Sequence, residues 1–146
     1  MATTYYSDKV IAGAHVPAKG GIHDITVVAT FEAATALVID DVIQMVKIPA
    51  GATVTHVALA TDDLDTGTTI VLDVGDGDND DAYILGSTIG QAGGYAEWGT
   101  GIVGAFPCAM FKTYSADDTI DVHVDTAPTG GGTGTIVLKV CYTFNP

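Results

Sequence analysis

Short apolar runs separated by Gly-, Pro- and Asp-containing segments divide the whole chain, and this pattern is typical of many short β-strands. The alternation is most regular near the end of the sequence. The run 119–125 places Ile120, Val122 and Val124 on one side, and the run 135–144 places Ile136, Leu138, Val140, Tyr142 and Phe144 on one side. The Gly-rich segment TAPTGGGTG joins these two runs, so they are predicted to form an antiparallel hairpin with one face in the core.

Other runs also have the composition of strands. The segment 42–48 is almost entirely apolar and is predicted to be a strand buried on both faces. The segment 31–41 fits either a helical turn or a strand. The remaining predicted strands are 25–31, 53–61, 68–75, 82–85 and 107–114, and a Gly-rich loop covers 86–105.

About eight strands with turn signals between them favour an all-β fold, since one sheet buries its apolar face against another. Long connections between some of the strands favour a jelly-roll-like antiparallel β-sandwich over an immunoglobulin-like one. Residues 1–20 have little pattern and are predicted to be an N-terminal arm or a loose first strand. Residues 21–146 are predicted to be a single β-sandwich domain.

Composition narrows the possible partners. The chain has 146 residues, is 47% hydrophobic and 16% charged, and carries a net charge of −13. The high hydrophobic content argues against disorder. The negative charge disfavours binding to nucleic acid and to anionic membranes. It favours a partner with basic patches, although a merely solvated acidic surface explains it equally simply.

Two further observations bear on the compartment. The N-terminal sequence has no basic segment followed by an apolar one, so we expect no secretory signal and synthesis in a cytoplasm. Cys108 and Cys141 form no C-x-x-C motif, and both are expected to be reduced at synthesis.

The densest acidic segment follows the predicted strand 68–75. Alternate aspartates at Asp76, Asp78 and Asp80 could direct oxygens at a calcium ion. The EF-hand pattern fails, because Asp81 stands where it needs Gly and Ser87 where it needs Glu. These three residues are therefore calcium candidates only, and a solvated turn is the competing interpretation.

Catalytic motifs are missing from the sequence. The four histidines lie in separate segments, and no G-x-S-x-G, P-loop or dinucleotide-binding motif is present. We therefore predict neither an enzyme nor a resident cofactor. Aromatic residues suggest binding instead: Tyr5 and Tyr6 in the arm, and Tyr95 and Trp98 in the Gly-rich loop, are candidate partner contacts. Core filling is the alternative for these side chains.

Three segments carry a resemblance to a known family. IPAGATV (48–54), LDTGTTIVLDVGDGD (64–78) and TGTIVLKVCYTF (133–144) resemble small virion proteins of tailed bacteriophages, of the head decoration or capsid cement type. The resemblance covers roughly the last 100 residues. It implies a β-sandwich that binds the major capsid protein on the outside of the assembled capsid, after synthesis in the host cytoplasm. It also implies a homo-oligomer, a dimer or a trimer, with no catalytic residues.

A second hypothesis comes from a different functional class. A β-sandwich with aromatic loops and an acidic turn could bind carbohydrate or a host surface, as a module of a head or tail fibre, with calcium assisting. An enzyme on a jelly-roll scaffold is the third, and no pair of histidines with a carboxylate at metal-ligand spacing supports it.

Overall fold

The computed structural model describes residues 2–12, 23–98 and 111–144, and it is built almost entirely of β-strands. The elements are β1 (Thr4–Tyr6), α1 (Asp8–Ala12), β2 (His23–Ala33), β3 (Val42–Ile48), β4 (Ala52–Thr61), β5 (Val71–Asp76), β6 (Ile84–Ser87), the 3-10 turn η1 (Ile89–Gln91), β7 (Gly94–Glu97), β8 (Asp118–Thr126) and β9 (Gly134–Phe144). No helix in these described stretches is long and apolar enough to cross a membrane.

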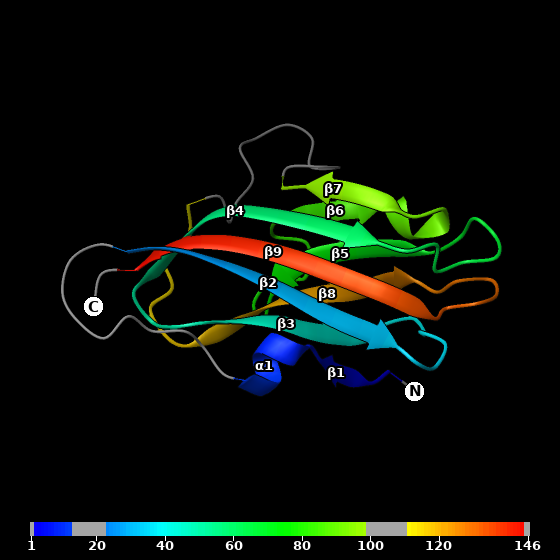
Figure 1. Cartoon of the computed structure of the whole chain (residues 1–146), viewed down its shortest axis with the longest axis horizontal. Coiled ribbons are helices and arrows are strands. Elements are labelled where there is room, and N and C mark those ends of the chain that lie inside the picture. Colours follow the sequence, from blue (N-terminus) through cyan, green and yellow to red (C-terminus); the bar gives the residue numbers. More distant parts are fainter. Residues whose placement is uncertain (1, 13–22, 99–110, 145–146) are drawn as a thin grey trace.

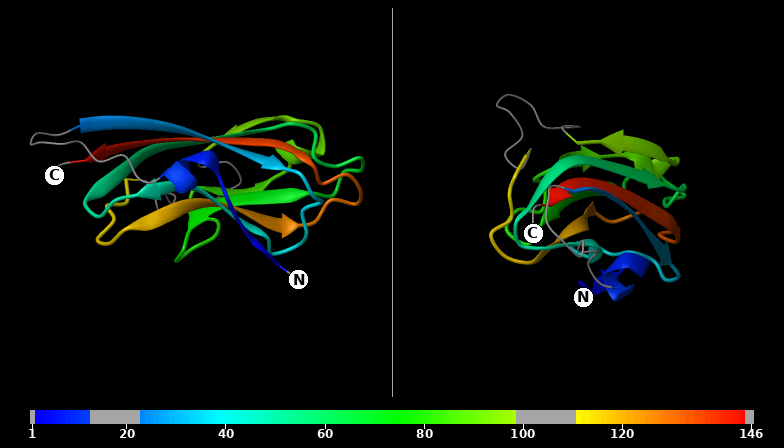
Figure 2. Two further views of the ribbon diagram at one scale, coloured as in Figure 1. Left: turned by 60° about the horizontal axis from the view of Figure 1, so that its bottom comes forward. Right: turned by 60° about the vertical axis from the view of Figure 1, so that its left-hand side comes forward.

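The strands form two packed sheets. One has the order β1-β3-β8-β5-β6 and the other the order β2-β9-β4-β7. In Figure 1 the strands β2, β9 and β4 lie side by side in front of the larger sheet, and Figure 2 shows the two layers edge-on. From β2 to β9, every connection except β5–β6 passes from one sheet to the other. The eight strands therefore form two interlocked sets of four, β2-β9-β4-β7 and β3-β8-β5-β6, and this arrangement is a jelly roll. The predicted jelly-roll-like antiparallel β-sandwich is confirmed, with nine strands in the described part of the chain.

The core lies between the sheets and is supplied by alternate residues of each strand. On β9 the residues Ile136, Leu138, Val140, Tyr142 and Phe144 are all buried, as their spacing predicts. On β8 the inward set is Ile120, Val122 and Val124. Because the period of two fixes which side chains face inward, the remaining side chains of these strands form the two outer faces of the sandwich.

The predicted hairpin of 119–125 with 135–144 is wrong. These runs are β8 and β9, and they lie in different sheets. Their Gly-rich connection bonds to the β4–β5 loop instead: the N–H of Gly132 donates to the carbonyl of Leu64 at 2.6 Å, and the N–H of Thr66 donates to the carbonyl of Gly130 at 3.0 Å. A connection of this length can span the roughly 10 Å between two packed sheets.

Three local predictions also need correction. The strand β3 is not buried on both faces, since Lys47 is exposed and Val42 and Gln44 are half-buried. The segment 31–41, for which a helical turn and a strand are both possible from the sequence, is strand as far as Ala33 and then an irregular loop with a turn at residues 39–40. Of the predicted strand 107–114, the described residues 111–114 form no strand, but they pair with the start of β4 through an isolated bridge between Thr113 and Thr53 and through backbone bonds of Lys112 and Tyr114. The rest lies outside the described residues.

The first residues pack on the sandwich. The strand β1 runs parallel to β3 at the edge of the larger sheet. Ser7 begins α1: its hydroxyl accepts the N–H of Val10 at 3.3 Å and donates to the carbonyl of Met45. The carboxylate of Asp8 accepts the N–H of Thr30 from the edge strand β2 at 2.8 Å. Residues 4–12 thus join both sheets along one side, and the division into an arm 1–20 and a domain 21–146 stays a prediction.

Candidate functional site

Three regions hold the residues that the sequence singles out: the β5–β6 loop, the surface around β7, and β1. The β5–β6 loop turns back tightly over its own strand. A side chain at Gly75 would place its Cβ 1.9 Å from the carbonyl oxygen of Asn79, so only glycine allows this approach. The path of the loop thus requires glycine at position 75.

Asp76 is the buried centre of this loop. One of its oxygens accepts the N–H groups of Asp78 at 3.0 Å and Asn79 at 3.1 Å. The other accepts the Lys112 ammonium at 2.8 Å and the Tyr114 hydroxyl at 2.6 Å. Burial by itself raises the pKa of Asp76, but the bonds from Lys112 and Tyr114 outweigh it and hold that pKa below its usual value.

The network continues into the core. The Tyr114 hydroxyl lies 2.7 Å from the Tyr83 hydroxyl, and both rings are buried. The Lys112 ammonium also lies 4.7 Å above the ring of Tyr114. Burial and the neighbouring Tyr83 raise the pKa of Tyr114 far above its usual range, so it stays a neutral donor to Asp76. These contacts tie the β5–β6 loop to the segment that precedes β8.

The calcium candidates are only partly brought together. Among the described residues, Asp76, Asp78 and Asp118 have carboxylate oxygens within 4.8 Å of one another, and Asp80 is not in this group. The Lys112 ammonium already lies 2.8 Å from Asp76 and 3.7 Å from Asp78. A metal ion would have to compete with this internal cation, and calcium binding stays a prediction.

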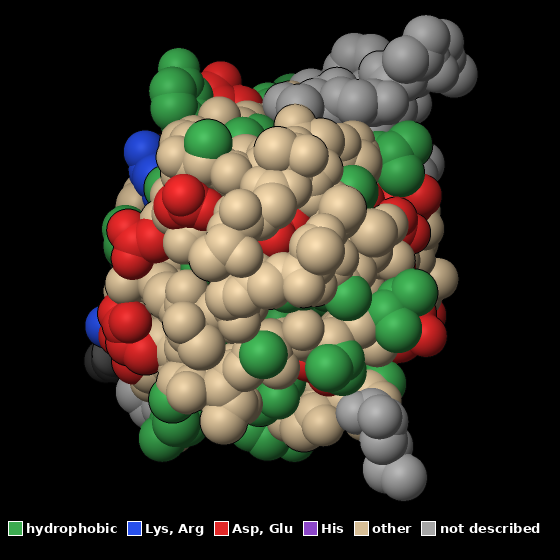
Figure 3. Space-filling view, turned by 90° about the vertical axis from the view of Figure 1, so that its right-hand side faces the viewer, with side chains coloured by type: hydrophobic (Ala, Val, Ile, Leu, Met, Phe, Trp, Pro, Cys, Tyr) green, Lys and Arg blue, Asp and Glu red, His purple; other side chains and the backbone are tan. Residues whose placement is uncertain are grey.

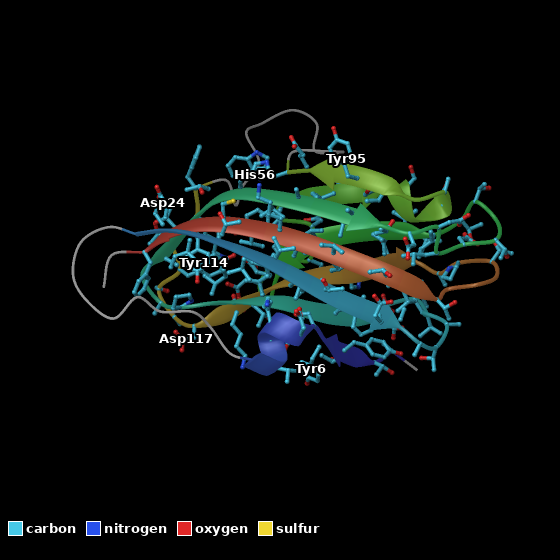
Figure 4. All side chains as sticks on the ribbon, viewed as in Figure 1. Tyr6, Asp24, His56, Tyr95, Tyr114 and Asp117 are labelled. Carbon is cyan, nitrogen blue, oxygen red and sulfur yellow. The ribbon has the colours of Figure 1, made fainter. Side chains whose placement is uncertain are left out.

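Aromatic residues gather around β7, where two of the predicted contacts lie. Trp98 is half-buried against the core, and its ring lies 5.7 Å from that of His56 and 5.4 Å from that of Phe111. Tyr95 is 72% exposed and Phe111 is 56% exposed. Phe111 has a φ of 59°, a strained backbone for a bulky side chain. Figure 4 labels His56 and Tyr95 on this side of the sandwich.

The other two predicted contacts lie elsewhere. Tyr5 packs on Phe31 with ring centroids 5.4 Å apart, whereas Tyr6 is 52% exposed. The strand β1 is an edge of the larger sheet and β7 an edge of the smaller one. Figure 4 shows Tyr6 and Tyr95 on opposite sides of the molecule. The structure therefore forms two separate aromatic surfaces, and sequence reasoning missed His56 and Phe111 because they are distant from Tyr95 in sequence.

Asp65 is a second buried carboxylate, which the sequence reasoning did not single out. It accepts the N–H groups of Gly67 at 2.8 Å, Thr69 at 2.7 Å and Ile70 at 2.9 Å. It also accepts the N–H of Thr129 at 3.1 Å, from the β8–β9 loop. Burial raises the pKa of Asp65, but these backbone bonds dominate and hold that pKa well below its usual range. The signal was present in the D-T-G-T-T sequence, whose local bonds resemble an Asx-turn.

Asp65 joins the β4–β5 and β8–β9 loops, which lie at the right-hand end of the sandwich in Figure 1, and Figure 3 views that end. On that surface the acidic side chains are scattered, and the basic ones are seen only along one margin. The β2–β3 loop at this end has its own buried carboxylate, Asp41, which accepts the N–H groups of Thr3 at 2.7 Å and Val38 at 2.8 Å. Buried aspartates at both ends thus hold loops in place.

The outer face of the larger sheet holds titratable groups on β5 and β8. His123 has its Nε2 3.7 Å from Asp40 and its Nδ1 4.0 Å from Asp73. Asp121 is buried, and its Oδ1 has no hydrogen-bond partner. Burial raises the pKa of Asp121 to about 6, and the charges of Asp118, Asp76 and Asp80 act in the same direction.

Solved structures similar to this chain include chains of three bacteriophage capsids. A chain of the Ralstonia phage GP4 capsid has a TM-score of 0.79 and 28% identity, over 98% of this chain and 99% of that one. A chain of the cyanophage Pam1 capsid has a TM-score of 0.72 and 26% identity, over 91% of this chain and 95% of that one. A chain of the acid-stable capsid of Helicobacter pylori bacteriophage KHP30 shares the fold, with a TM-score of 0.54, 18% identity and coverage of 85% and 94%.

Comparison with family models and with curated protein sequences finds no match. The structural similarities to two phage capsids support a structural, non-enzymatic component of a phage virion. No enzyme family is indicated by any of these comparisons.

Proposed function

We propose that this protein is a bacteriophage capsid decoration (cement) protein that binds the outside of the assembled head and stabilises it across the seams between subunits. The observation that carries the proposal is the similarity to a chain of the GP4 capsid over nearly the full length of both chains. Its counterpart in that capsid is therefore also one small sandwich of about this size. The resemblance of 48–54, 64–78 and 133–144 to decoration proteins supports the same role.

The physical basis is mass action. A protein that binds the assembled shell but not its free subunits stabilises the assembled state by the free energy of its binding. A sandwich that spans a seam adds contacts that must break before the subunits part. Rigidity is an advantage here, because little conformational entropy is lost on docking. The carboxylate networks of Asp65 and Asp76 supply such rigidity at the loop ends.

The partners follow from the same proposal. The major capsid protein is the shell partner, and the protein itself forms a homo-oligomer. Tyr5, Tyr6, Tyr95 and Trp98 are the proposed partner-binding residues, of which Tyr6 and Tyr95 offer the most exposed ring surface. The protein is made in the host cytoplasm and resides on the capsid exterior. The charge of −13 makes neither nucleic acid nor an anionic membrane a suitable partner.

Removal of the protein from purified virions tests the role. Stripped heads should lose DNA at a lower temperature and at a milder fall in salt than intact heads, and adding the protein back should restore them. The variant Tyr6→Ala should rebind stripped heads more weakly, whereas Leu85→Ala, a control at another exposed apolar position, should rebind normally. Stripped heads that withstand heat and low salt as well as intact ones would exclude a cement function.

One observation favours the second candidate, a carbohydrate- or host-surface-binding module. Exposed aromatic rings at Tyr95 and Phe111 beside Trp98 could stack on sugar rings. A glycan-array screen with wild-type protein and Tyr95→Ala separates the two proposals. Saturable glycan binding that is lost in Tyr95→Ala, with no effect of the protein on head stability, would favour this module over the cement function.

A further inference from the structure

The end of β3 and the start of β8 border a hollow on the outer face of the larger sheet. Its volume is about 420 Å³, in the range of sites that hold a small molecule or a side chain. Figure 4 labels Asp117, just before β8, at one end of the sandwich. We call this space the β3–β8 hollow, and it is lined by Gln44, Lys47, Ile48, Asp117, Asp118 and Thr119.

The hollow is acidic, and backbone groups hold its carboxylates in place. Asp117 accepts the N–H of Ala50 at 2.9 Å, and Asp118 accepts the N–H of Thr119 at 2.8 Å. Lys47 is the one cation in the lining, and it is exposed. It forms no ion pair with any carboxylate of the described residues. The two carboxylates of the lining are therefore not neutralised by contact with Lys47.

A third carboxylate, Asp121, closes the inner wall of the hollow. It is 8% exposed, and its Oδ1 has no hydrogen-bond partner. The period of two places it on the same face as Thr119, and the register places it opposite Gln44. On its other side is Gly75, over which the carbonyl of Asn79 lies too close for any side chain. Asp121 is thus closed off toward β5 and bordered by two residues that line the hollow.

This unpartnered oxygen indicates a missing donor. A buried carboxylate that lacks a hydrogen bond lowers stability, and such groups are rare in native proteins. A cation in the β3–β8 hollow would supply the compensating charge beside Asp121. The attraction would be strong for its distance, because Asp121 is already removed from water when the chain folds. The chain contains no arginine, so a guanidinium group in this hollow must come from a different protein.

We propose that an arginine side chain of the shell partner inserts into the β3–β8 hollow and donates to the carboxylates of Asp117 and Asp118. This inference deepens the proposed function, on which it rests for the identity of the partner. Guanidinium has five N–H donors in a planar fork, whereas the lysine ammonium is a compact point charge. The acceptors of the hollow are spread around it, since Gln44 and Thr119 add oxygens to the two carboxylates. That spread favours arginine.

The β3–β8 hollow is separate from the acidic β5–β6 loop, although the two share Asp118. The Lys112 ammonium pairs with Asp76 at 2.8 Å and with Asp78 at 3.7 Å. Within the described residues it forms no ion pair with Asp117 or Asp118. A cation that enters the hollow therefore does not have to displace Lys112, unlike a calcium ion bound by the loop.

The surroundings of the hollow also suit a basic partner. Tyr6 lies opposite Gln44 in the parallel pairing of β1 with β3, so this proposed partner contact stands beside the hollow on the same face. Tyrosine and arginine are enriched at the energetic centres of protein interfaces. Asp73 and Asp125 lie further along the same face. A basic region of the partner, with the arginine at its centre, therefore complements this side of the sandwich.

A peptide titration of the purified full chain tests the inference without any capsid. The probe is N-acetyl-Gly-Arg-Gly-amide, with versions that carry lysine or citrulline, the neutral isostere of arginine, as controls. The backbone amide NMR signals of Gln44 and Thr119 should shift saturably, with a dissociation constant of about 1–10 mM. The lysine peptide should bind at least about 3-fold more weakly, and the citrulline peptide should not bind. Equal binding of either control, or no saturable shift at these amides, would overturn the arginine contact.

Variants locate the binding. The double variant Asp117→Asn with Asp118→Asn should weaken the arginine peptide at least about 10-fold, while its amide oxygens still accept the N–H groups of Ala50 and Thr119. Asp125→Asn removes one charge from the same face and should leave the affinity unchanged within about 2-fold. Lys47→Met should tighten binding about 3-fold by removing the cation at the rim, a gain that misfolding cannot imitate. An unchanged affinity in the double variant would overturn the proposal.

Stripped heads separate this inference from the cement function. The same double variant should rebind them more weakly than Asp125→Asn does. If the double variant protects heads as well as wild type, the arginine contact is wrong and the cement function stands. If the wild type binds the arginine peptide as expected but does not protect stripped heads, only the proposed function is refuted.

Discussion

The two ends of the sandwich both use a buried aspartate to hold their loops, but with different partners. Asp65 at one end is satisfied by backbone N–H groups and a threonine hydroxyl, whereas Asp76 at the other end receives an ammonium and a tyrosine hydroxyl from distant side chains. The bonds to Asp65 fix the backbone conformation of its own loop. The bonds to Asp76 join the β5–β6 loop to the segment that precedes β8 through a charged pair. Similar acidic sequences can thus perform different structural tasks.

The largest expected effect is at Asp76. The variant Asp76→Ala leaves the Lys112 ammonium and the Tyr114 hydroxyl without their acceptor, so the free energy of unfolding should fall by about 3 kcal/mol. Urea denaturation measures it. Asp78→Ala is the matched control, because its side chain is 86% exposed and its pair with Lys112 is long, and it should change stability by less than about 0.5 kcal/mol. If both variants lowered the free energy of unfolding equally, the bonds from Lys112 and Tyr114 to Asp76 would not be what distinguishes this end from the Asp65 end.

Substitution of Asp65 should lower stability less than substitution of Asp76, and its effect on hydrogen exchange should be confined to its own loop. In Asp65→Asn one oxygen still accepts, but the amide group turns N–H donors toward the N–H groups of Thr69 and Ile70. The unfolding midpoint should fall, and hydrogen exchange at Gly67, Thr69 and Ile70 should accelerate more than elsewhere. Asp80→Asn, an exposed position in the other acidic loop, is the control. Uniform acceleration across the sandwich would argue against a local backbone role.

These two ends also show what the sequence could predict. The bonds from Asp65 to Gly67 and Thr69 span two and four residues, so D-T-G-T-T contains them as turn chemistry. The partners of Asp76 lie 36 and 38 residues further on, at Lys112 and Tyr114, and no local pattern indicates them. Without them the acidic loop looks open to a cation, and its alternate aspartates therefore suggest calcium.

The same limit explains the errors in the fold. Strict alternation predicted the buried side of β9 correctly, because burial on one face imposes a period of two. Alternation does not indicate which strands pair with each other. The runs that form β8 and β9 therefore resemble a hairpin across their Gly-rich connection, although they lie in different sheets. The aromatic surface around β7 was predicted only at Tyr95 and Trp98, since tertiary packing brings in His56 and Phe111.

A third aspartate, Asp121, differs from Asp65 and Asp76 because its pKa is raised, whereas theirs are lowered. Its folded-state pKa of about 6 lies above the unfolded value of 3.8, so the folded protein binds this proton more tightly. Its contribution to stability is complete below about pH 4 and is lost as pH rises through about 6. Asp65 and Asp76 have lowered pKa values, so their contribution is present above about pH 4 and is lost on acidification.

The variant Asp121→Asn isolates that contribution. At pH 7.5 it should raise the free energy of unfolding by about 2 kcal/mol, since it removes a buried charge that has one unpartnered oxygen. At pH 4 the wild-type carboxyl is already neutral, so the gain should vanish. Urea denaturation at both pH values measures it, with Asp125→Asn as the exposed control on the same strand. A loss of stability at both pH values would mean that the charge of Asp121 is compensated.

The smallest effect concerns calcium at the Asp76 end. The Lys112 ammonium lies within 4.0 Å of two of the three clustered carboxylates, so about 5 mM calcium should raise the wild-type melting temperature by less than about 1 °C. The variant Lys112→Met keeps the bulk of the stem but removes the internal cation. Calcium should then raise its melting temperature by several degrees, since Asp76, Asp78 and Asp118 are left as uncompensated neighbours. A large calcium-dependent rise in the melting temperature of the wild type that disappears in Asp76→Ala and Asp78→Ala would instead make this loop a metal site. The two ends would then differ in function, because the Asp76 end would bind a ligand and the Asp65 end would be structural.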